Sequence, residues 1–449
     1  MARRLVLAVL LTFLIVAALF AAVSWRVQIA PIEPPARAAF DTALIARGAA
    51  LAALADCAAC HTAADGKAYA GGYPLRTPFG TIYGTNITPD PDTGIGRWSQ
   101  AAFVRAMREG VDRAGRHLYP AFPYTHFTIM SDEDLQALYA FMMTREPVRA
   151  EARANELVFP LNVRMLVSAW KMLFFDQHRF RADPARGDEW NRGAYLTLGP
   201  AHCGACHTPR NVLGAEKERE FLAGGDAEGW HAPALNATFR APVPWTAESL
   251  FRYLRYGASE THEVAAGPMA SVVHNLGHVP EQEVRAIATY IASVIGPANT
   301  EQQQRGDQAL ARARTPAAVV EPDARSAQRS ESDSTLQAGS VIYATTCAGC
   351  HDNAARAPGA PSGEGLHLAL STSIALPSPG NLIRIILQGM APPDGERGPF
   401  MPGFTGALTD GQVAALVTYL RATYTDRPAW PNVDREVRKA SQQLAEREQ

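Results

Sequence analysis

The sequence has almost no net charge. Its 449 residues include 42 Lys and Arg against 44 Asp and Glu, a formal balance of −2. Nucleic-acid binding usually needs a clearly basic surface, so we expect no nucleic-acid partner. Charged residues are only 19% of the chain and apolar residues 47%, a composition that allows buried cores and argues against wholesale disorder.

Common catalytic signatures are also missing. The chain contains no G-x-G-x-x-G dinucleotide fingerprint, no P-loop, and no G-x-S-x-G nucleophile elbow in a supporting context. Nothing in the sequence therefore indicates nucleotide-dependent or acyl-transfer chemistry.

Charge is absent from one long stretch at the N-terminus. From Leu5 to Trp25 no residue is charged, and at ~1.5 Å per residue this run can cross a ~30 Å hydrocarbon core. Arg3 and Arg4 precede it, so the positive-inside rule places the rest of the chain on the periplasmic side of the inner membrane. A cleaved signal peptide ending near Ala21 is the alternative for residues 1–25.

Cysteine is scarce, and every cysteine belongs to one pattern. The six residues form three C-x-x-C pairs, each followed at once by a histidine. The pairs are Cys57 and Cys60, Cys203 and Cys206, and Cys347 and Cys350, and the histidines are His61, His207 and His351. Two thiols at this spacing can bind the two vinyl groups of a haem, while the adjacent imidazole binds the iron. The sequence therefore predicts three covalently bound haem c groups.

Other uses of C-x-x-C explain the pattern less well. A structural zinc site would have to join two pairs that lie more than 140 residues apart in the sequence. Thioredoxin-like pairs need no histidine, and structural disulfides do not explain three histidines in fixed register.

The three motifs are 146 and 144 residues apart, which indicates repeated domains. A helical segment precedes each motif, with a glycine at position 48, 193 or 339, and a second one follows at 134–141, 283–290 or 412–419. The apolar spacing in the second segment places its side chains on one helix face. We predict a mainly α fold of three tandem class I cytochrome c domains, at 41–150, 186–297 and 336–425, after an N-terminal transmembrane helix.

Three other segments separate or follow these domains. Residues 151–185 include an apolar run broken by Arg164 and Lys171, which predicts an amphipathic segment that packs between domains, on a partner or on the membrane surface. Residues 298–335 are rich in Gln, Ala, Arg and Ser, which predicts a flexible linker. Residues 426–449 form a charged tail.

The sixth iron ligand decides whether a haem only carries electrons, and methionine is the usual choice for transfer. Met401 lies 11 residues before Gln412, and Met269 lies 14 residues before Glu283, where a ligand loop is expected. Met390 is the rival for Met401.

The first domain departs from this pattern. The matching position, 12 residues before Asp134, holds Phe122, which cannot bind iron. The nearby donors are His126 and Met130, with His117 further away. We predict His126 as the ligand, with Met130 and an open iron as alternatives.

Several stretches resemble a known family, the tri-haem cytochrome c subunits of membrane-bound dehydrogenases. The resemblance covers roughly residues 40–425 and is most specific in Cys57-Ala-Ala-Cys-His-Thr, Thr77-Pro-Phe-Gly-Thr-Ile-Tyr-Gly-Thr-Asn-Ile-Thr-Pro89, Gly94-Ile-Gly-Arg-Trp98, Arg108-Glu-Gly-Val111 and His117-Leu-Tyr-Pro120. It implies a catalytic dehydrogenase partner, of molybdopterin or quinoprotein type, and electron delivery to ubiquinone or a terminal oxidase. Subunits of alcohol dehydrogenases usually have Met in place of Phe122, and the Phe-Pro-Tyr-x-His form is more similar to the molybdenum hydroxylase branch.

The sequence therefore favours an electron-transfer subunit over a catalytic one. The alternative is a haem enzyme, such as a peroxidase or an oxidase component, that uses an open first iron.

Overall fold

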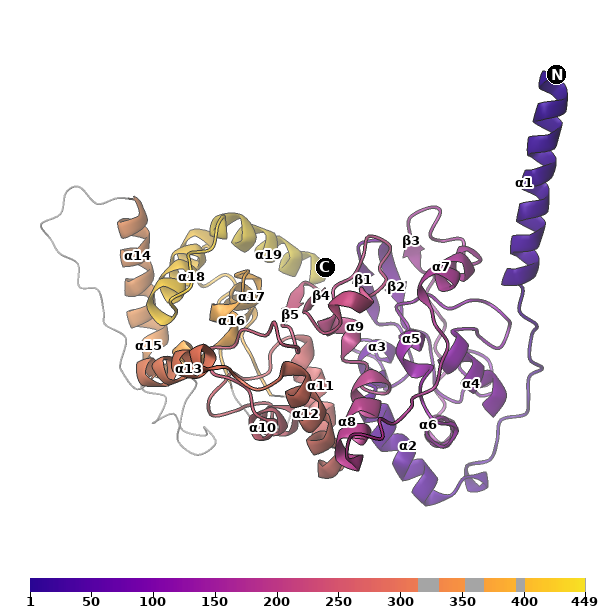
Figure 1. Ribbon diagram of the computed structural model, residues 1–449, viewed down its shortest axis with the longest axis horizontal. Helices are drawn as coiled ribbons and strands as arrows, with labels where there is room; N and C mark the ends of the chain where they lie inside the picture. The colour runs from indigo at the N-terminus through magenta and orange to yellow at the C-terminus, as the bar shows by residue number, and fades with distance from the viewer. Residues whose placement is uncertain (314–330, 352–366, 393–399, 449) are drawn as a thin grey trace, which may run out of the picture. The chain divides into compact units, whose positions relative to one another are not determined.

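Helices dominate the computed structural model (Figure 1). The structure describes residues 1–313, 331–351, 367–392 and 400–448. The chain divides into two units. The first comprises Met1–Ala205, Asn211–Ala215 and His278–Pro280, and the second comprises Cys206–Arg210, Glu216–Gly277 and Glu281–Gln449. The prediction of a mainly helical protein is confirmed.

The first unit begins with the helix predicted to cross the membrane. Helix α1, Ala2–Ser24, is the one helix among the described residues that is long and apolar enough to span a bilayer. The other helices are α2 Thr42–Leu54, α3 Cys57–His61, α4 Gln100–Glu109, α5 Tyr124–Phe127, α6 Asp132–Met143, α7 Leu166–Phe174 and α8 Asp188–Leu198. A short 3₁₀ turn, Arg37–Ala39, precedes α2.

Helices α2 and α6 form the core of this unit, and they cross at a glycine. A Cβ atom on Gly48 would overlap the carbonyl oxygen of Ala137 and press on Phe141. The glycine that recurs before each C-x-x-C-H motif is thus explained here by backbone contact between two helices. Asp41 caps α2 by accepting a 2.7 Å hydrogen bond from the amide of Ala43. The hydroxyl group of Ser131 caps α6 by accepting a hydrogen bond from the amide of Asp134.

A small antiparallel sheet follows the first motif. Its order is β1 (Pro74–Thr77), β2 (Gly80–Tyr83) and β3 (Glu156–Leu157), with Leu75 opposite Ile82 and Gly80 opposite Leu157. Strand β3, which precedes α7 in the sequence, thus lies alongside the β1–β2 hairpin. The chain that leaves this hairpin packs on the first motif.

The second unit contains the strands β4 and β5 and most of the remaining helices. The bounds are β4 Gly225–Ala227, β5 Trp230–Ala232, α10 Ala247–Tyr256, α11 Pro268–Leu276, α12 Glu281–Ile295, α13 Thr300–Ala313, α14 Glu331–Ile342, α15 Ala348–His351, α16 Thr372–Ala375, α17 Gly380–Gln388, α18 Asp410–Tyr424 and α19 Val433–Glu448. Helix α9, Gly204–His207, lies where the two units meet in the sequence, and 3₁₀ turns cover Glu218–Glu220 and Leu368–Leu370.

Helices α14 and α18 repeat the crossing of α2 and α6. A Cβ atom on Gly339 would overlap the carbonyl oxygen of Ala415 and the side chain of Tyr419. The C-terminal end of α14 continues into a π-helical turn, Tyr343–Cys347, that leads directly into the third motif. Thr409 and Gln412 form a capping box at the start of α18. The core around this crossing is formed by Ile374, Ile383, Val413, Leu416, Val417 and Leu420.

The structure differs from the sequence-based predictions in two segments, 298–335 and 426–449. Part of the stretch 298–335, predicted as a flexible linker, is helix α13, and its residues Gly306 and Ala309 are buried. The Gln, Ala and Arg residues that suggested disorder are also good helix formers, so composition alone misled the prediction. Residues 314–330 of that linker lie outside the described residues. In the charged tail, Val437, Ala440 and Leu444 of α19 are buried in the core of the second unit.

Candidate haem-binding sites

The first C-x-x-C-H motif is the short helix α3. Its N-cap, Asp56, has left-handed backbone angles (φ 45°), which turn the chain sharply out of α2. Atom Nδ1 of His61 lies 2.6 Å from the carbonyl oxygen of Thr85. A neutral imidazole that donates from Nδ1 keeps its lone pair on Nε2, which is the atom that can bind iron. The ring is therefore held in the tautomer and orientation of an iron ligand.

The loop that supplies this carbonyl packs directly on the motif. Gly84 follows β2, and a Cβ atom there would overlap the carbonyl oxygen of Cys60. Sequence analysis did not identify Gly84 or Thr85 as part of the site, although both lie in a stretch that carries the family resemblance.

The second motif has the same arrangement. Nδ1 of His207 lies 2.6 Å from the carbonyl oxygen of Pro233, the residue after β5. A Cβ atom on Gly225 of β4 would lie 2.5 Å from the carbonyl oxygen of Cys206. After both motifs, therefore, a β-hairpin follows C-x-x-C-H, and a glycine in or next to the hairpin packs on the motif. A carbonyl group one or two residues after the hairpin orients the histidine.

The third motif opens onto a cavity of the second unit. The cavity brings together the side chains that were predicted to hold the haem, because Cys347, His351, Met390 and Met401 all line it. Most of the other lining residues are apolar, namely Leu368, Leu382, Ile385, Ile386, Phe404, Leu416 and Leu420. A thiol, an imidazole and thioethers around an apolar space are the donor set and surroundings that haem c requires, so these residues fit the cofactor.

Glu263 also lines this cavity and was not identified from the sequence. Its carboxylate accepts hydrogen bonds from the hydroxyl groups of Ser371 (3.1 Å) and Ser373 (3.0 Å) and from the amide of Ser373 (3.1 Å). Burial raises the pKa of Glu263, while these hydrogen bonds oppose the change. An acidic group with a raised pKa thus lies beside the predicted third haem.

Met390 and Met401 are paired through their backbones. The amide of each donates a 2.8 Å hydrogen bond to the carbonyl oxygen of the other. Both thioethers therefore belong to the same cavity, and Met401 remains the predicted ligand with Met390 as its rival.

A local repeat relates the three ligand loops. After each motif a helix (α4, α10 or α17) ends at a glycine with positive φ, and the next residue forms an isolated β-bridge with the predicted ligand loop. The bridges are Val111 with His117, Ala258 with Val264, and Met390 with Met401. After the first and second motifs, the amide of the residue that follows the bridge also donates to the carbonyl oxygen of the helix-ending glycine, Leu118 to Gly110 (2.7 Å) and Ala265 to Gly257 (2.8 Å).

This repeat aligns Phe122 with Met269. Phe122 lies five residues after the bridging residue His117, and Met269 lies five residues after Val264. The phenylalanine thus occupies the loop position that the predicted methionine ligand occupies after the second motif.

In the first unit, His126 lies within α5, and Met130 lies three residues after the last residue of that helix. His126 is largely buried, and its Nδ1 lies 2.9 Å from the carbonyl oxygen of Leu198, a hydrogen bond of the same form as those of His61 and His207. Met130 is completely buried, and its carbonyl oxygen accepts a 2.8 Å hydrogen bond from Arg108. The hydrogen bond on Nδ1 suits His126 for the predicted ligand role, whereas Met130 is packed as a core residue.

Burial favours the neutral form of four motif side chains. It raises the pKa of the Cys57 thiol to about 12, with further contributions from Asp56 and Cys60, and the pKa of the Cys347 thiol to about 11. Burial lowers the pKa of His61 and of His207. Uncharged thioethers and neutral imidazoles suit these surroundings better than thiolates or imidazolium groups. The described residues also include no group of three or more His, Cys, Asp or Glu side chains that could form a zinc site.

Comparison with known proteins agrees with these motifs. Residues 45–146 match the family model described as cytochrome c, and residues 334–420 match the one described as cytochrome C oxidase, cbb3-type, subunit III. The fructose dehydrogenase cytochrome subunit of Gluconobacter japonicus is 35% identical over 93% of this chain and 87% of its own length. The chain belongs to the cytochrome c subunits of membrane-bound dehydrogenases. A family member therefore carries covalently bound haem c and transfers electrons.

Two further relatives show the range of this cytochrome family. The gluconate 2-dehydrogenase cytochrome c subunit of Pantoea cypripedii is 36% identical over 86% of each chain. A nicotinate dehydrogenase subunit of Pseudomonas putida is 46% identical over 91% of this chain, which spans only about a third (33%) of that relative's length.

Proposed function

We propose that this cytochrome subunit binds three haem c groups and transfers electrons from a catalytic dehydrogenase subunit to ubiquinone or a terminal oxidase. The haems would occupy three tandem domains at 41–150, 186–297 and 336–425. The observation that carries the proposal is the matched setting of His61 and His207, each fixed by a 2.6 Å hydrogen bond from Nδ1 to a backbone carbonyl.

The protein's own residues would hold each haem in a defined way. Six cysteines form the thioether bonds, and His61, His207 and His351 bind the irons. Met269 and Met401 would complete the second and third sites, and His126 the first. The haem irons supply one-electron chemistry, and the protein contributes ligand choice, burial and the spacing between groups.

Haem stoichiometry tests this proposal directly. The intact protein should gain the mass of three haems, and a pyridine haemochrome assay should give three per chain. The double variant C57S/C60S should lose one of the three, whereas A58S/A59S, which leaves the C-x-x-C-H pattern intact, should keep all three. Fewer than three haems in the unaltered protein would overturn the proposal.

The electron donor is the second part of the proposal. We infer a molybdopterin-type dehydrogenase, because the nicotinate dehydrogenase relative is 46% identical whereas the fructose and gluconate dehydrogenase cytochromes are 35–36% identical. The Phe-Pro-Tyr-x-His sequence around Phe122 supports the same branch. Purification of the chain from its native membrane, followed by mass spectrometry of co-purifying proteins, would identify the donor. Recovery of a quinoprotein dehydrogenase instead would contradict this part.

The periplasmic side of the inner membrane is the proposed location. Arg3 and Arg4 in the first turn of α1 support it through the positive-inside rule. Protease added to spheroplasts should digest the haem domains, whereas protection of those domains in intact spheroplasts would place them on the cytoplasmic side.

A second candidate function follows from Phe122. If neither His126 nor Met130 binds the first iron, that iron is open and could act as a peroxidase or oxidase centre. Carbon monoxide binding to the reduced protein separates the two functions, because a chain with three six-coordinate irons should bind very little.

A further inference from the structure

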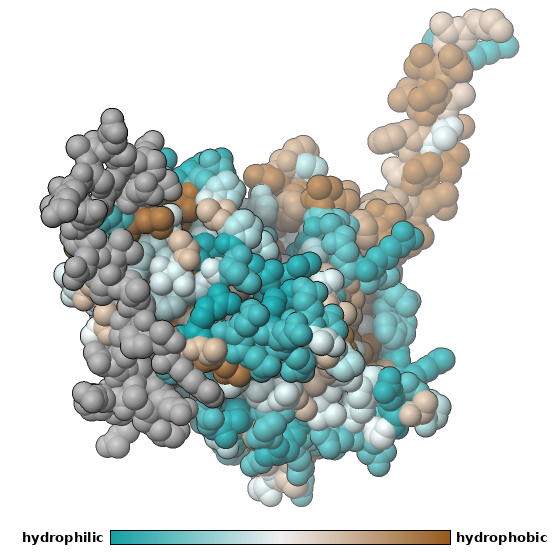
Figure 2. Space-filling model, turned by 60° about the vertical axis from the view of Figure 1, so that its left-hand side comes forward, coloured by the Kyte–Doolittle hydropathy of each residue, from teal (hydrophilic) through white to brown (hydrophobic). Residues whose placement is uncertain are grey.

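Most charged side chains of this protein lie at its surface, where water screens them. Figure 2 shows hydrophilic residues over much of the visible face, apart from α1. A charged side chain at a cavity acts on its surroundings more strongly, because little water lies between it and its neighbours. In the described part of the chain, each unit has a cavity with such a side chain.

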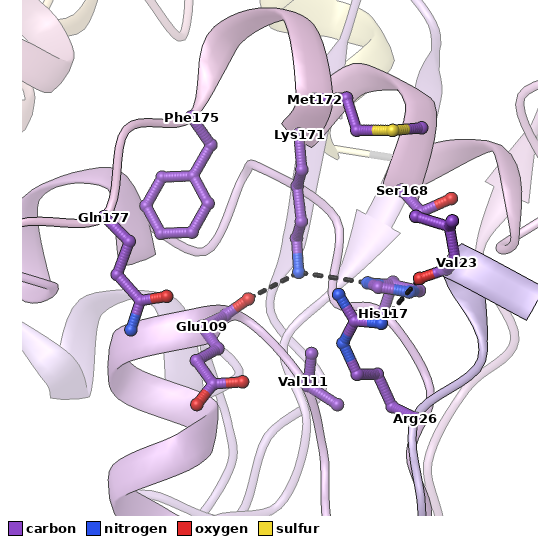
Figure 3. A pocket seen from close by; sticks show the side chains of 10 residues that line it. All are labelled: Val23, Arg26, Glu109, Val111, His117, Ser168, Lys171, Met172, Phe175 and Gln177. Carbon is purple, nitrogen blue, oxygen red and sulfur yellow. Dashed lines mark hydrogen bonds between the residues drawn. The ribbon is translucent and has the colours of Figure 1, made fainter.

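In the first unit this side chain is Lys171, which points from α7 into a cavity beside the end of α1 (Figure 3). Its Nζ donates to the carbonyl oxygens of Glu109 (2.6 Å) and Gly110 (2.7 Å) and lies 3.2 Å from Nδ1 of His117. None of the predicted iron ligands is among the described residues that line this cavity. The lysine thus joins α7 to the C-terminal end of α4, away from those ligands.

In the second unit the charged side chain is Glu263, and here predicted haem-binding residues share the cavity. Glu263 lines the same cavity as Cys347, His351 and Met401. The described lining of that cavity includes no lysine or arginine. A carboxylate therefore lies at a mostly apolar space whose lining has no cation to neutralise it.

Hydrogen bonds hold the Glu263 side chain in its charged form. The three bonds from Ser371 and Ser373 all reach the same oxygen, Oε2. Donors of this kind favour the ionised carboxylate, and they oppose the rise in the pKa of Glu263 that burial causes. Burial and the charge of Glu263 raise the pKa of the neighbouring Tyr253 of α10, which therefore remains a neutral phenol.

Glu263 comes from the predicted ligand loop of the second motif, although it lines the cavity of the third. The next residue, Val264, forms the isolated β-bridge of that loop, and Met269 follows five residues later. Its hydrogen-bond partners Ser371 and Ser373 come after the third motif in the sequence. The carboxylate is thus fixed between the segments predicted to bind the second and third haems.

We propose that the Glu263 carboxylate is a redox-tuning residue that lowers the reduction potential of the third haem. An oxidised haem core carries one more positive charge than the reduced core, so a carboxylate at the same cavity stabilises the oxidised form. The residue acts through its charge and not as a ligand. Because it belongs to the loop of the second motif, packing between the two proposed haem domains brings this charge to the third site. The inference rests on the proposed function, since it requires a haem at the third motif.

Spectroelectrochemical titration of the full-length protein at pH 8 tests the proposal. This pH is well above the ordinary pKa of a glutamate, about 4.3. Glu263→Gln keeps an oxygen acceptor for Ser371 and Ser373 but removes the charge. We expect the potential of one haem to rise by about 59 mV, which corresponds to a tenfold change in its one-electron equilibrium constant.

Two variants serve as controls. Glu263→Asp keeps the carboxylate and should leave the potentials close to those of the unaltered protein. Glu260→Gln removes an exposed carboxylate three residues earlier, which pairs with Arg252 at 2.7 Å. Water screens that charge, so all potentials should stay unchanged. Should Glu263→Gln lose haem, Glu263→Met, which removes the charge together with the need for hydrogen-bond partners, gives a second measurement of the same rise.

Removal of the third attachment site identifies the haem that responds. In the C347S/C350S background, Glu263→Gln should shift neither of the two remaining potentials. A rise that persists there would show that the charge acts on another haem, and it would overturn the assignment.

The outcomes separate this inference from the proposed function. Three attached haems with unchanged potentials in Glu263→Gln, or with equal rises in Glu263→Gln and Glu263→Asp, would overturn the redox-tuning role alone. A rise of the same size in Glu260→Gln would also overturn it, because the effect would then not depend on the cavity. Fewer than three haems in the unaltered protein would instead remove the proposed function.

Discussion

The phenol of Tyr195 donates a 2.6 Å hydrogen bond to the carboxylate of Asp134. The Asp134 side chain is only 1% exposed and also pairs with Arg47 at 2.6 Å. The carboxylate on α6 thus joins α2 and α8 within the first unit. Burial, with the neighbouring Asp134 carboxylate, raises the pKa of Tyr195, so the tyrosine remains the donor over the ordinary pH range.

Asp134→Ala should destabilise the first unit by about 3 kcal/mol, because it leaves a buried tyrosine hydroxyl and a half-exposed arginine without their acceptor. Tyr195→Phe should cost about 1 kcal/mol. Urea denaturation followed by circular dichroism measures both. Glu133→Ala removes the exposed acidic neighbour and should change the free energy of unfolding by less than about 0.5 kcal/mol. Equal effects of Asp134→Ala and Glu133→Ala would contradict this account.

Local sequence patterns predicted the helices better than their partners. The apolar spacing that aligned 134–141, 283–290 and 412–419 corresponds to α6, α12 and α18. The same pattern identified Asp134 only as the first residue of the segment 134–141. Its contact with Tyr195 links residues 61 positions apart. Such pairing depends on how helices pack, which helix-period arguments do not contain.

At the candidate sites, too, the sequence predicted local features but not contacts between distant residues. The C-x-x-C-H spacing alone predicts nine attachment and proximal residues, because that chemistry is local. The carbonyl groups of Thr85 and Pro233, 24 and 26 residues from the histidines they orient, have no side-chain signature. Backbone acceptors of this kind can be recognised only after the hairpins β1–β2 and β4–β5 are in place.

The close crossing of α14 and α18 predicts a large effect of one methyl group. Gly339→Ala should destabilise the second unit by about 1–3 kcal/mol, because its Cβ would overlap the carbonyl oxygen of Ala415. Gly411→Ala in α18 is the matched control, since its Cβ would meet nothing within 4 Å. The better helix propensity of alanine should make that control neutral or slightly stabilising. Thermal unfolding of both variants measures the difference, and a neutral Gly339→Ala would show that the helices can separate without cost.

His262 should make the stability of the second unit depend on pH. Its ring stacks on Trp245 with 3.5 Å between ring centroids, only 2% of its surface is exposed, and burial lowers its pKa to about 4. Because the folded state binds the proton more weakly than the unfolded state, stability is full above about pH 6.5 and falls as the pH drops toward 4. The loss should approach about 3 kcal/mol.

Comparison with His262→Gln isolates this contribution. Glutamine can still donate to the carbonyl oxygen of Val243, which accepts from Nε2 of His262 at 3.2 Å, but it does not titrate. The difference in unfolding free energy between the two proteins should therefore narrow from pH 7 to pH 4 in urea denaturation. A difference that stays constant with pH would show that His262 is protonated equally in both states.

A substitution at Phe122 tests how the proposed first haem site differs from the proposed second one. Because its place after the β-bridge matches that of Met269, Phe122→Met should bring a thioether to the first iron. A methionine ligand stabilises the reduced state, so one of the haem potentials should rise, on the order of 100 mV, in a spectroelectrochemical titration. Phe122→Leu, which has no donor atom, should leave the potentials close to those of the unaltered protein. If both variants shift the potentials equally, packing rather than ligation at this position tunes the first haem. If neither variant shifts the potentials, His126 binds the iron too firmly for a new thioether to replace it. The double variant His126→Ala/Phe122→Met should then show the higher reduction potential.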